Sequence, residues 1–182
     1  MNDKEIKNTS KFLSLILRHQ PETIGLSLDE NGWADTEILL LQLTAHGHPV
    51  SQELLETVVS TNDKKRFAFN EDHTRIRASQ GHSVEVELNL QHKQPPEWLY
   101  HGTIADFVEN IQKDGILKMS RQHVHLSQDQ HTARAVGGRR GKPVILSINA
   151  GQMQEAGFIF YLSENGVWLT DHVPAAYITF TL

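Results

Sequence analysis

The feature that most constrains the fold is a change in hydrophobic periodicity near the middle of the chain. Early apolar residues such as Phe12, Leu13 and Ile16 recur at helical spacing. Residues 84 to 90 instead alternate apolar and polar side chains, which predicts a strand, and Pro95-Pro96 then breaks the pattern. The 182 residues suffice for two small domains. We therefore predict two domains, with the boundary inside residues 81 to 95.

The first half has the pattern of a small helical domain with a hairpin. Residues 5 to 18 predict a helix, and "GLSLDENGWADTEILLLQL" predicts a short strand, a turn at Asn31-Gly32 and a helix capped by Asp35 or Thr36. "SQELLETVVST" predicts a helix capped by Ser51, and "RFAF" and "RIRAS" predict a two-stranded ribbon. This order is typical of a winged helix, a module that binds nucleic acid in some proteins and other proteins elsewhere.

The second half alternates strands with short helices. "WLYHGT", "HVHLS" and "PVILSIN" predict strands, "IADFVENIQKDG" predicts a helix ended by Gly115, and "QDQHTARAVGG" predicts a short helix. "FIFYLSENGVWLT" predicts a hairpin that turns at Asn165-Gly166, and "AAYITFTL" closes the chain. The fold class is therefore α+β.

Composition excludes several classes of protein. The chain has no cysteine, so it can form neither a disulfide framework nor a catalytic thiolate. It has no apolar run of about 18 residues and no signal-peptide core, so we expect a cytoplasmic protein that does not insert into membranes. Eleven histidines invite a metal site, but His123 and His125 are only two ligands on one strand face, and no helical HExxH is present. We expect no metal.

Positive charge is concentrated although the net charge is -5. Residues 118 to 142 hold six Lys or Arg against one acid, and Lys64, Lys65 and Arg66 form a second cluster. Basic pockets in an acidic protein suit a small polyanionic target. The alternative is a solvated basic face.

Two short motifs are candidates for chemistry. Arg18 and His19 end the first predicted helix, where cations are favoured by the helix dipole, so a plain helix-end signal before Pro21 is the simpler reading of this pair. His101, Gly102 and Thr103 form a strand-to-helix corner, where backbone N–H groups and a helix N-terminus can receive a dinucleotide. A plain turn capped by Thr103 is the simpler reading of that motif.

Five blocks in order carry a resemblance to a known family. "LILRHQPETIGL", "KKRFAF", "LYHGT", "SRQHVHLS" and "RRGKPVIL" closely resemble the NAD-dependent RNA 2'-phosphotransferases, which remove a 2'-phosphate from RNA such as spliced tRNA. The resemblance covers residues 5 to 180. It implies a winged-helix RNA-binding lobe (residues 1–82), a connecting segment (83–95) and an ADP-ribosyltransferase-like, NAD-binding lobe (96–182). The active site is then expected in the cleft between the lobes.

The resemblance also assigns roles to residues. It implies that Arg18, His19, Arg66 and Arg121 are catalytic, with the guanidinium groups binding the phosphate oxygens bidentately. It implies that NAD+ contacts a second set of residues: His101, Gly102, Thr103, His125, Ser127, Arg134 and Arg139. Many protein-modifying transferases have a glutamate at the position that Val167 occupies here, so the resemblance favours a substrate phosphate as the nucleophile.

The implied reaction uses NAD+ as co-substrate and needs no metal. The RNA 2'-phosphate attacks the nicotinamide ribose, nicotinamide leaves, and an ADP-ribosylated RNA phosphate forms. The ribose 2''-OH then attacks phosphorus, which gives RNA with a 2'-OH and ADP-ribose 1'',2''-cyclic phosphate. The expected partner is RNA with an internal 2'-phosphate, and no obligate protein partner is inferred. Two alternatives remain: an ADP-ribosyltransferase acting on terminal phosphates of nucleic acid, and a noncatalytic winged-helix nucleic-acid binder with a nucleotide-sensing domain.

Overall fold

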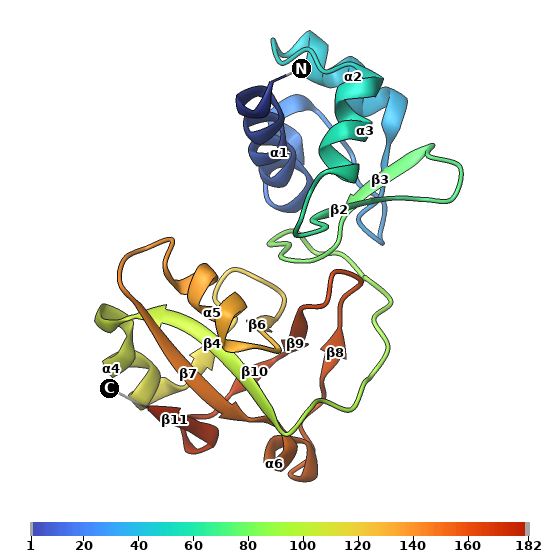
Figure 1. The fold of residues 1–182 in the computed structure, drawn as a ribbon. Coiled ribbons are helices and arrows are strands. Elements are labelled where there is room, and N and C mark those ends of the chain that lie inside the picture. The colour runs from blue at the N-terminus through green and yellow to red at the C-terminus, as the bar shows by residue number, and fades with distance from the viewer. Residues whose placement is uncertain (1, 181–182) are drawn as a thin grey trace. The chain divides into compact units, whose positions relative to one another are not determined.

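The chain forms two compact units, divided between Asn89 and Leu90 (Figure 1). The structure is a computed structural model, and it describes residues 2–180. Both units combine helices with small antiparallel sheets, which confirms the α+β class. Within the described residues, no helix is both long and apolar enough to cross a membrane.

The helices of the N-terminal unit begin where the sequence provides capping side chains. They are α1 (Asp3–Arg18), the 3-10 helix η1 (Pro21–Ile24), α2 (Thr36–Ala45) and α3 (Gln52–Ser60). The side chains of Asn2, Asp35 and Ser51 each accept a hydrogen bond from the backbone N–H three residues later. The predicted helices and the caps at Asp35 and Ser51 are confirmed.

The predicted ribbon is confirmed as an antiparallel pair within a three-stranded sheet. The strands are β1 (Ala34–Asp35), β2 (Phe67–Phe69) and β3 (Arg75–Ala78), in the order β1-β3-β2. The predicted short strand before Asn31-Gly32 is wrong, because β1 follows that turn. The Asp29 carboxylate accepts the N–H groups of Asn31 and Trp33, so the chain turns there and only residues 34 and 35 reach β3.

The predicted strand at residues 84 to 90 is also wrong. The segment pairs with no strand in the described part of the chain, and Asn89 within it has φ +52°, which is not a strand conformation. Its alternation has another cause, because Val86 and Leu88 are buried while Glu85 and Glu87 are exposed. The segment is tied to the 29–33 turn by the Glu87 N–H, which donates to the Glu30 carbonyl oxygen at 2.6 Å.

The C-terminal unit contains most of the strands. Its strands are β4 (Trp98–Ile104), β5 (Ile116–Leu117), β6 (Val124–Leu126), β7 (Pro143–Asn149), β8 (Tyr161–Leu162), β9 (Trp168–Thr170), β10 (His172–Val173) and β11 (Ile178–Phe180). Its helices are α4 (Ala105–Asp114), α5 (Gln130–Gly137), α6 (Ala150–Glu155) and the 3-10 helix η2 (Ala175–Tyr177). They confirm the predicted elements of this half, including Gly115 as the C-cap of α4 and the turn at Gly166. Residues 181 and 182 of the predicted closing strand lie outside the described residues.

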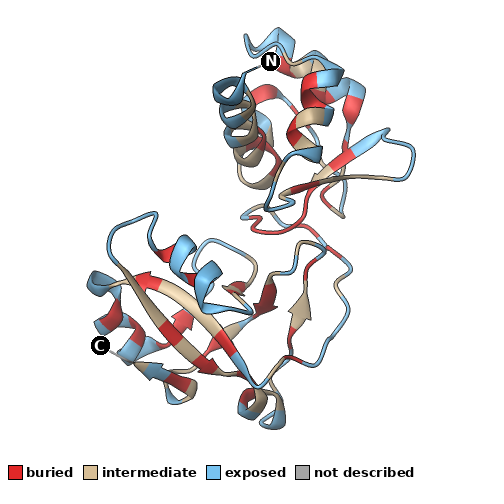
Figure 2. Cartoon of the chain, in the orientation of Figure 1, coloured by how far each residue is buried: buried red, intermediate tan, exposed pale blue. Residues whose placement is uncertain are grey.

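Three sheets organise this unit. Their strand orders are β11-β7-β4, β6-β9-β8 and β10-β5, and every pairing is antiparallel. Strand β4 pairs with β7 along its whole length, from Trp98 opposite Asn149 to Ile104 opposite Pro143. Figure 2 shows the buried residues lying inside each unit, and the two units have separate apolar cores.

Helix α5 lies directly against β4, and this contact depends on two glycines. A Cβ added at Gly102 would overlap the Ala133 carbonyl oxygen, and one added at Gly137 would lie 2.9 Å from the Gly102 carbonyl carbon. Backbone meets backbone at this point, so neither position has room for a side chain. The neighbour that requires glycine at position 102 is thus a helix of the same unit.

The packing predicts a large cost for Gly102→Ala. The new methyl group must push α5 away from β4, so we expect the free energy of unfolding to fall by about 3 kcal/mol or more. Gly151→Ala in α6 is the matched control, because a Cβ there stays 3.3 Å or more from its neighbours and alanine favours a helix. Urea denaturation of both variants measures the difference. Equal stability of the two variants would contradict the close-contact account.

Candidate active site

Arg18 and His19 lie at the C-terminal end of α1, as predicted. Arg18 is the last helical residue and His19 is the C-cap, and both are half-buried. The Arg18 carbonyl oxygen accepts hydrogen bonds from the N–H groups of Ser83 (2.8 Å) and Val84 (3.3 Å). His19 Nδ1 lies 2.8 Å from the Ser83 hydroxyl oxygen. A segment distant in sequence therefore holds this end of the helix.

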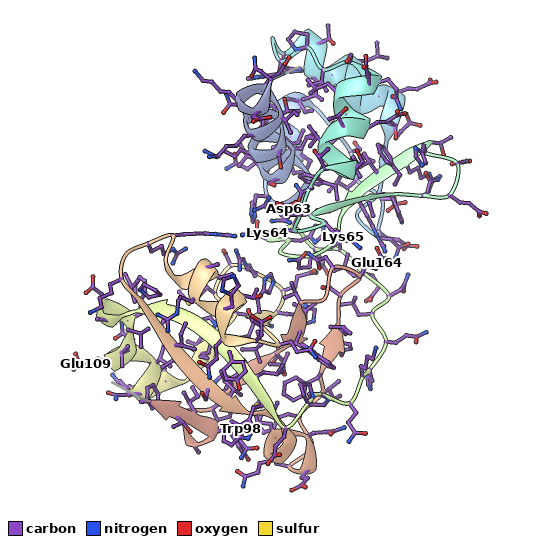
Figure 3. All side chains as sticks on the ribbon, in the orientation of Figure 1. Asp63, Lys64, Lys65, Trp98, Glu109 and Glu164 are labelled. Carbon is purple, nitrogen blue, oxygen red and sulfur yellow. The ribbon has the colours of Figure 1, made fainter. Side chains whose placement is uncertain are left out.

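Arg66 lies just before β2 and is fixed by the same region of the chain. Its carbonyl oxygen accepts a hydrogen bond from the Ser79 N–H at 2.9 Å, and the Ser79 hydroxyl donates to the Lys65 carbonyl oxygen at 2.8 Å. Lys64 and Lys65 precede Arg66 on the loop after α3 (Figure 3). Ser79 and Ser83 thus contact this region at three predicted catalytic residues. They bind the backbone of Arg18 and Arg66 and the ring of His19.

His82 is fully buried in this region, and sequence reasoning did not single it out. Neither of its ring nitrogens has a hydrogen-bond partner among residues 2–180. Burial, followed by the charges of Arg18, His19 and Arg77, lowers the pKa of His82 to about 4. The imidazole is therefore neutral at pH 7.

Three predicted residues of the C-terminal unit come together around β6. The Arg121 guanidinium donates to His125 Nδ1 at 3.3 Å, and His101 Nδ1 lies 3.3 Å from the His125 carbonyl oxygen. Because a guanidinium can only donate, His125 Nδ1 must accept, which leaves the proton of the neutral ring on Nε2. Arg121 and His101 thus contact the same residue, one through its ring and the other through its backbone.

The electrostatics of this cluster favour an anion. Partial burial, then the charges of Arg140 and Arg139, lowers the pKa of Arg121, although the residue as a whole stays exposed. Burial is also the main cause that lowers the pKa of His101, and the Arg121 charge adds to it. Three guanidinium groups that repel one another are stabilised by any anion that binds among them.

The other predicted NAD contacts have defined places. Gly102 and Thr103 lie in β4 opposite Ile145 and Val144. Thr103 does not cap α4, because the N-cap is Ile104 and no side chain caps that helix. Ser127 exchanges two backbone hydrogen bonds with Tyr100, at 2.8 and 2.9 Å, which brings the end of β6 beside β4.

The two remaining arginines are exposed. Arg134 lies in α5, and Arg139 lies in the loop between α5 and β7. The charge of Arg139 lowers the pKa of Arg121, and so does the charge of Arg140, a residue that the sequence analysis did not assign. Only the local excess of basic residues signalled Arg140, whereas no spacing pattern signalled Ser79, His82 or Ser83.

Metal ions and other ligands could in principle bind elsewhere in the chain. Among residues 2–180, no three His, Asp or Glu side chains gather in a way that could hold a metal ion. A cavity in the C-terminal unit is lined in part by His123, Tyr161 and Asp171. None of the predicted site residues lines this cavity.

Comparison with known proteins assigns the whole chain. Residues 3–172 match the sequence profile described as RNA 2'-phosphotransferase, Tpt1 / KptA family. The chain is 62% identical over 180 residues to a probable RNA 2'-phosphotransferase of Flavobacterium johnsoniae, with 99% of each chain covered. It is 55% identical to proteins of that name from Rhodopirellula baltica (98% of this chain, 97% of the relative) and Pseudomonas fluorescens (98% of each chain).

His82 predicts how stability changes with pH. Its pKa is about 4 in the folded chain and near 6.5 when unfolded, so the unfolded state binds the extra proton first as pH falls. Between pH 6.5 and 4 the folded state therefore loses stability, by about 2 kcal/mol at pH 5. His82→Leu abolishes this loss, so we expect the variant to gain about that much relative to the parent chain between pH 7 and pH 5.

Urea denaturation at the two pH values measures this gain. His46→Leu, which replaces an exposed histidine of the same unit, is the control and leaves the loss in place. A stability difference between His82→Leu and the parent chain that is the same at both pH values would refute a buried neutral His82.

Proposed function

This chain belongs to the RNA 2'-phosphotransferase, Tpt1 / KptA family, and from that membership we propose which residues perform the reaction and how. The chain is a transferase that removes a 2'-phosphate from RNA. This family is NAD-dependent in general, and we propose that NAD+ is the co-substrate here. The noncatalytic reading and the terminal-phosphate reading are not favoured.

One observation carries the residue assignment in the C-terminal unit. Arg121 contacts His125 and lies in the positive field of Arg139 and Arg140, next to His101. A 2'-phosphomonoester with nearly two negative charges relieves the repulsion among these groups. We assign Arg121 to the transferred phosphate, and Arg139 and Arg140 to the phosphates around it.

The N-terminal unit supplies the other phosphate ligands in this proposal. Arg18, His19 and Arg66 are half-buried and held by hydrogen bonds to their backbone or ring. Guanidinium groups keep their charge at any physiological pH and bind two phosphate oxygens at once. We propose that these residues and Arg121 bind one RNA 2'-phosphate, in a cleft between a winged-helix lobe and an ADP-ribosyltransferase-like lobe.

NAD+ is proposed to bind along β4 and β6. Burial lowers the pKa of His101 and so favours its uncharged ring, which can hydrogen-bond a ribose hydroxyl without adding charge. Thr103 lies in β4 and Ser127 directly follows β6, where it bridges to Tyr100 of β4. Arg134 and Arg139 supply positive charge for the pyrophosphate. His125 lines the nicotinamide side. Gly102 contributes by letting α5 pack closely behind β4.

The bound co-substrate supplies an electrophilic ribose carbon and nicotinamide as leaving group. The protein residues mainly orient the phosphate toward that carbon, because the phosphate is already an anionic nucleophile. In the second step, attack by the ribose hydroxyl develops charge on the phosphoryl oxygens, and Arg18, Arg66 and Arg121 stabilise it. His19 contacts the phosphate and donates a proton in this step. No metal takes part in this scheme.

We also propose how the enzyme binds RNA and where in the cell it acts. The winged-helix lobe binds the RNA, and the reaction needs no obligate protein partner. A cytoplasmic location suits an enzyme that works on spliced tRNA.

The test of the function uses RNA with one internal 2'-phosphate, NAD+ and a metal chelator. We expect nicotinamide release and RNA with a 2'-OH. Arg66→Ala and Arg121→Ala should each lower kcat by about 100-fold, because each removes a group that stabilises developing phosphoryl charge. ADP-ribosylated RNA should accumulate in both variants, since the second step suffers most.

Arg75→Ala is the control for charge removal. Arg75 makes an exposed ion pair with Asp29 at 3.3 Å and is not among the residues assigned to the phosphate, so its loss should leave kcat unchanged. Normal turnover by both Arg66→Ala and Arg121→Ala would show that the phosphate lies elsewhere. A matching oligonucleotide with a 5'-phosphate in place of the 2'-phosphate tests the acceptor.

His101→Ala separates co-substrate binding from phosphate binding. The variant loses one hydrogen bond to NAD+, so its KM for NAD+ should rise between about threefold and tenfold. The apparent affinity for RNA should stay the same. Steady-state kinetics with each substrate varied in turn measure both constants, and an unchanged KM for NAD+ would remove His101 from the NAD+ site.

A further inference from the structure

We propose that Ser83 is a positioning residue for His19, while Ser79 of the same segment hydrogen-bonds the backbone carbonyl groups of Lys65 and Arg66. This inference rests on the proposed function, because it concerns how two of the assigned catalytic residues are held. Neither serine stood out in the sequence. Both belong to the segment of residues 79–83, which joins β3 to the stretch before the second unit.

The C-terminal end of α1 has carbonyl groups that need hydrogen-bond donors from outside the helix. The last carbonyl groups of a helix have no partner within the helix and need one elsewhere. The Arg18 carbonyl oxygen finds two, in the N–H groups of Ser83 and Val84. The direction in which the chain leaves α1, and with it the place of His19, is therefore set by a segment more than 60 residues away.

The side chains of Ser83 and His19 are also in direct contact. The Ser83 hydroxyl lies 2.8 Å from His19 Nδ1, which is a full hydrogen bond. A hydroxyl can accept from a protonated Nδ1 or donate to an unprotonated one, so the contact persists in both charge states of the ring. A ring held through Nδ1 presents Nε2 at a fixed angle, and Nε2 can then donate to a phosphate oxygen.

Most of the segment of residues 79–83 is buried, which restricts its movement. Ser79, Gln80 and His82 are all at least nine-tenths buried. Gly81 between them has φ +87°, a conformation that L side chains rarely adopt, so glycine allows the turn. Residues 79–82 are thus buried and sharply turned, and the exposed Ser83 follows them directly.

Ser79 makes the equivalent contacts at the other end of the segment. Its N–H holds the Arg66 carbonyl oxygen and its hydroxyl holds the Lys65 carbonyl oxygen. Lys65 has φ +42°, so this carbonyl belongs to a backbone turn that costs energy without support. One short segment thus fixes His19 on one side and Arg66 on the other.

The test compares Ser83→Ala with Ser83→Thr in the full chain. We expect Ser83→Ala to lower kcat about tenfold, the upper range for the loss of one hydrogen bond, and to leave the KM for NAD+ unchanged. Ser83→Thr keeps the hydroxyl and should restore most of kcat. Ser14→Ala is the control, because the Ser14 hydroxyl donates only within α1, to the Ser10 carbonyl oxygen.

A double-mutant cycle decides whether Ser83 acts through His19. If it does, Ser83→Ala should have no further effect on kcat in a His19→Ala background. NMR of the His19 ring nitrogens, assigned by their absence in His19→Ala, gives a readout that does not depend on activity. The Nδ1 resonance should move in Ser83→Ala and return in Ser83→Thr.

The outcomes separate the two proposals. An additive effect in the cycle, or an unmoved Nδ1 resonance, overturns the role of Ser83 and leaves the proposed function intact. Full activity of His19→Ala overturns the catalytic role of His19 and therefore also the need to position it. Failure of Ser83→Thr to recover activity, with a normal Nδ1 resonance, likewise overturns positioning by the hydroxyl.

Discussion

The arrangement of the N-terminal unit depends on one constraint: the carbonyl groups at the end of a helix must be satisfied. Many helices solve this with a glycine just after the last turn. In this chain His19, not glycine, follows α1. The Arg18 carbonyl oxygen instead accepts hydrogen bonds from the N–H groups of Ser83 and Val84. The consequence is that two charged residues at a helix end become part of a long-range contact. A helix end that would otherwise fray is thereby available as a fixed platform for chemistry.

The C-terminal unit reaches the same result by close packing. Strand β4 is paired along seven residues with β7 and pressed against α5 through Gly102 and Gly137. The Tyr100–Ser127 bridge then adds the end of β6 to this rigid layer. His101 and His125 extend from that layer, so their separation is set by backbone hydrogen bonds. Arg121 is the adjustable member, since it reaches His125 from a loop.

What the sequence predicted correctly was mostly local. Caps such as Asp35 and Ser51, the ribbon around residues 70–74 and the turn at Gly166 depend on neighbours within a few residues. The errors came from tertiary contacts: residues 84–90 alternate because they are buried alternately, and Thr103 pairs in a sheet before it can cap a helix. Ser79 and Ser83 were missed for the same reason, because their partners lie far away in sequence.

Charge follows one rule in both units. In each, an arginine assigned to phosphate has a histidine near it whose pKa is lowered, chiefly by burial: His82 near Arg18 and His101 near Arg121. A neutral imidazole can pack beside a guanidinium, whereas an imidazolium would repel it. Beside these two histidines the positive charge is carried by Arg18 and Arg121, whose guanidinium groups do not titrate at physiological pH. Their attraction for a phosphate dianion is therefore constant over the range in which the phosphate itself stays doubly charged.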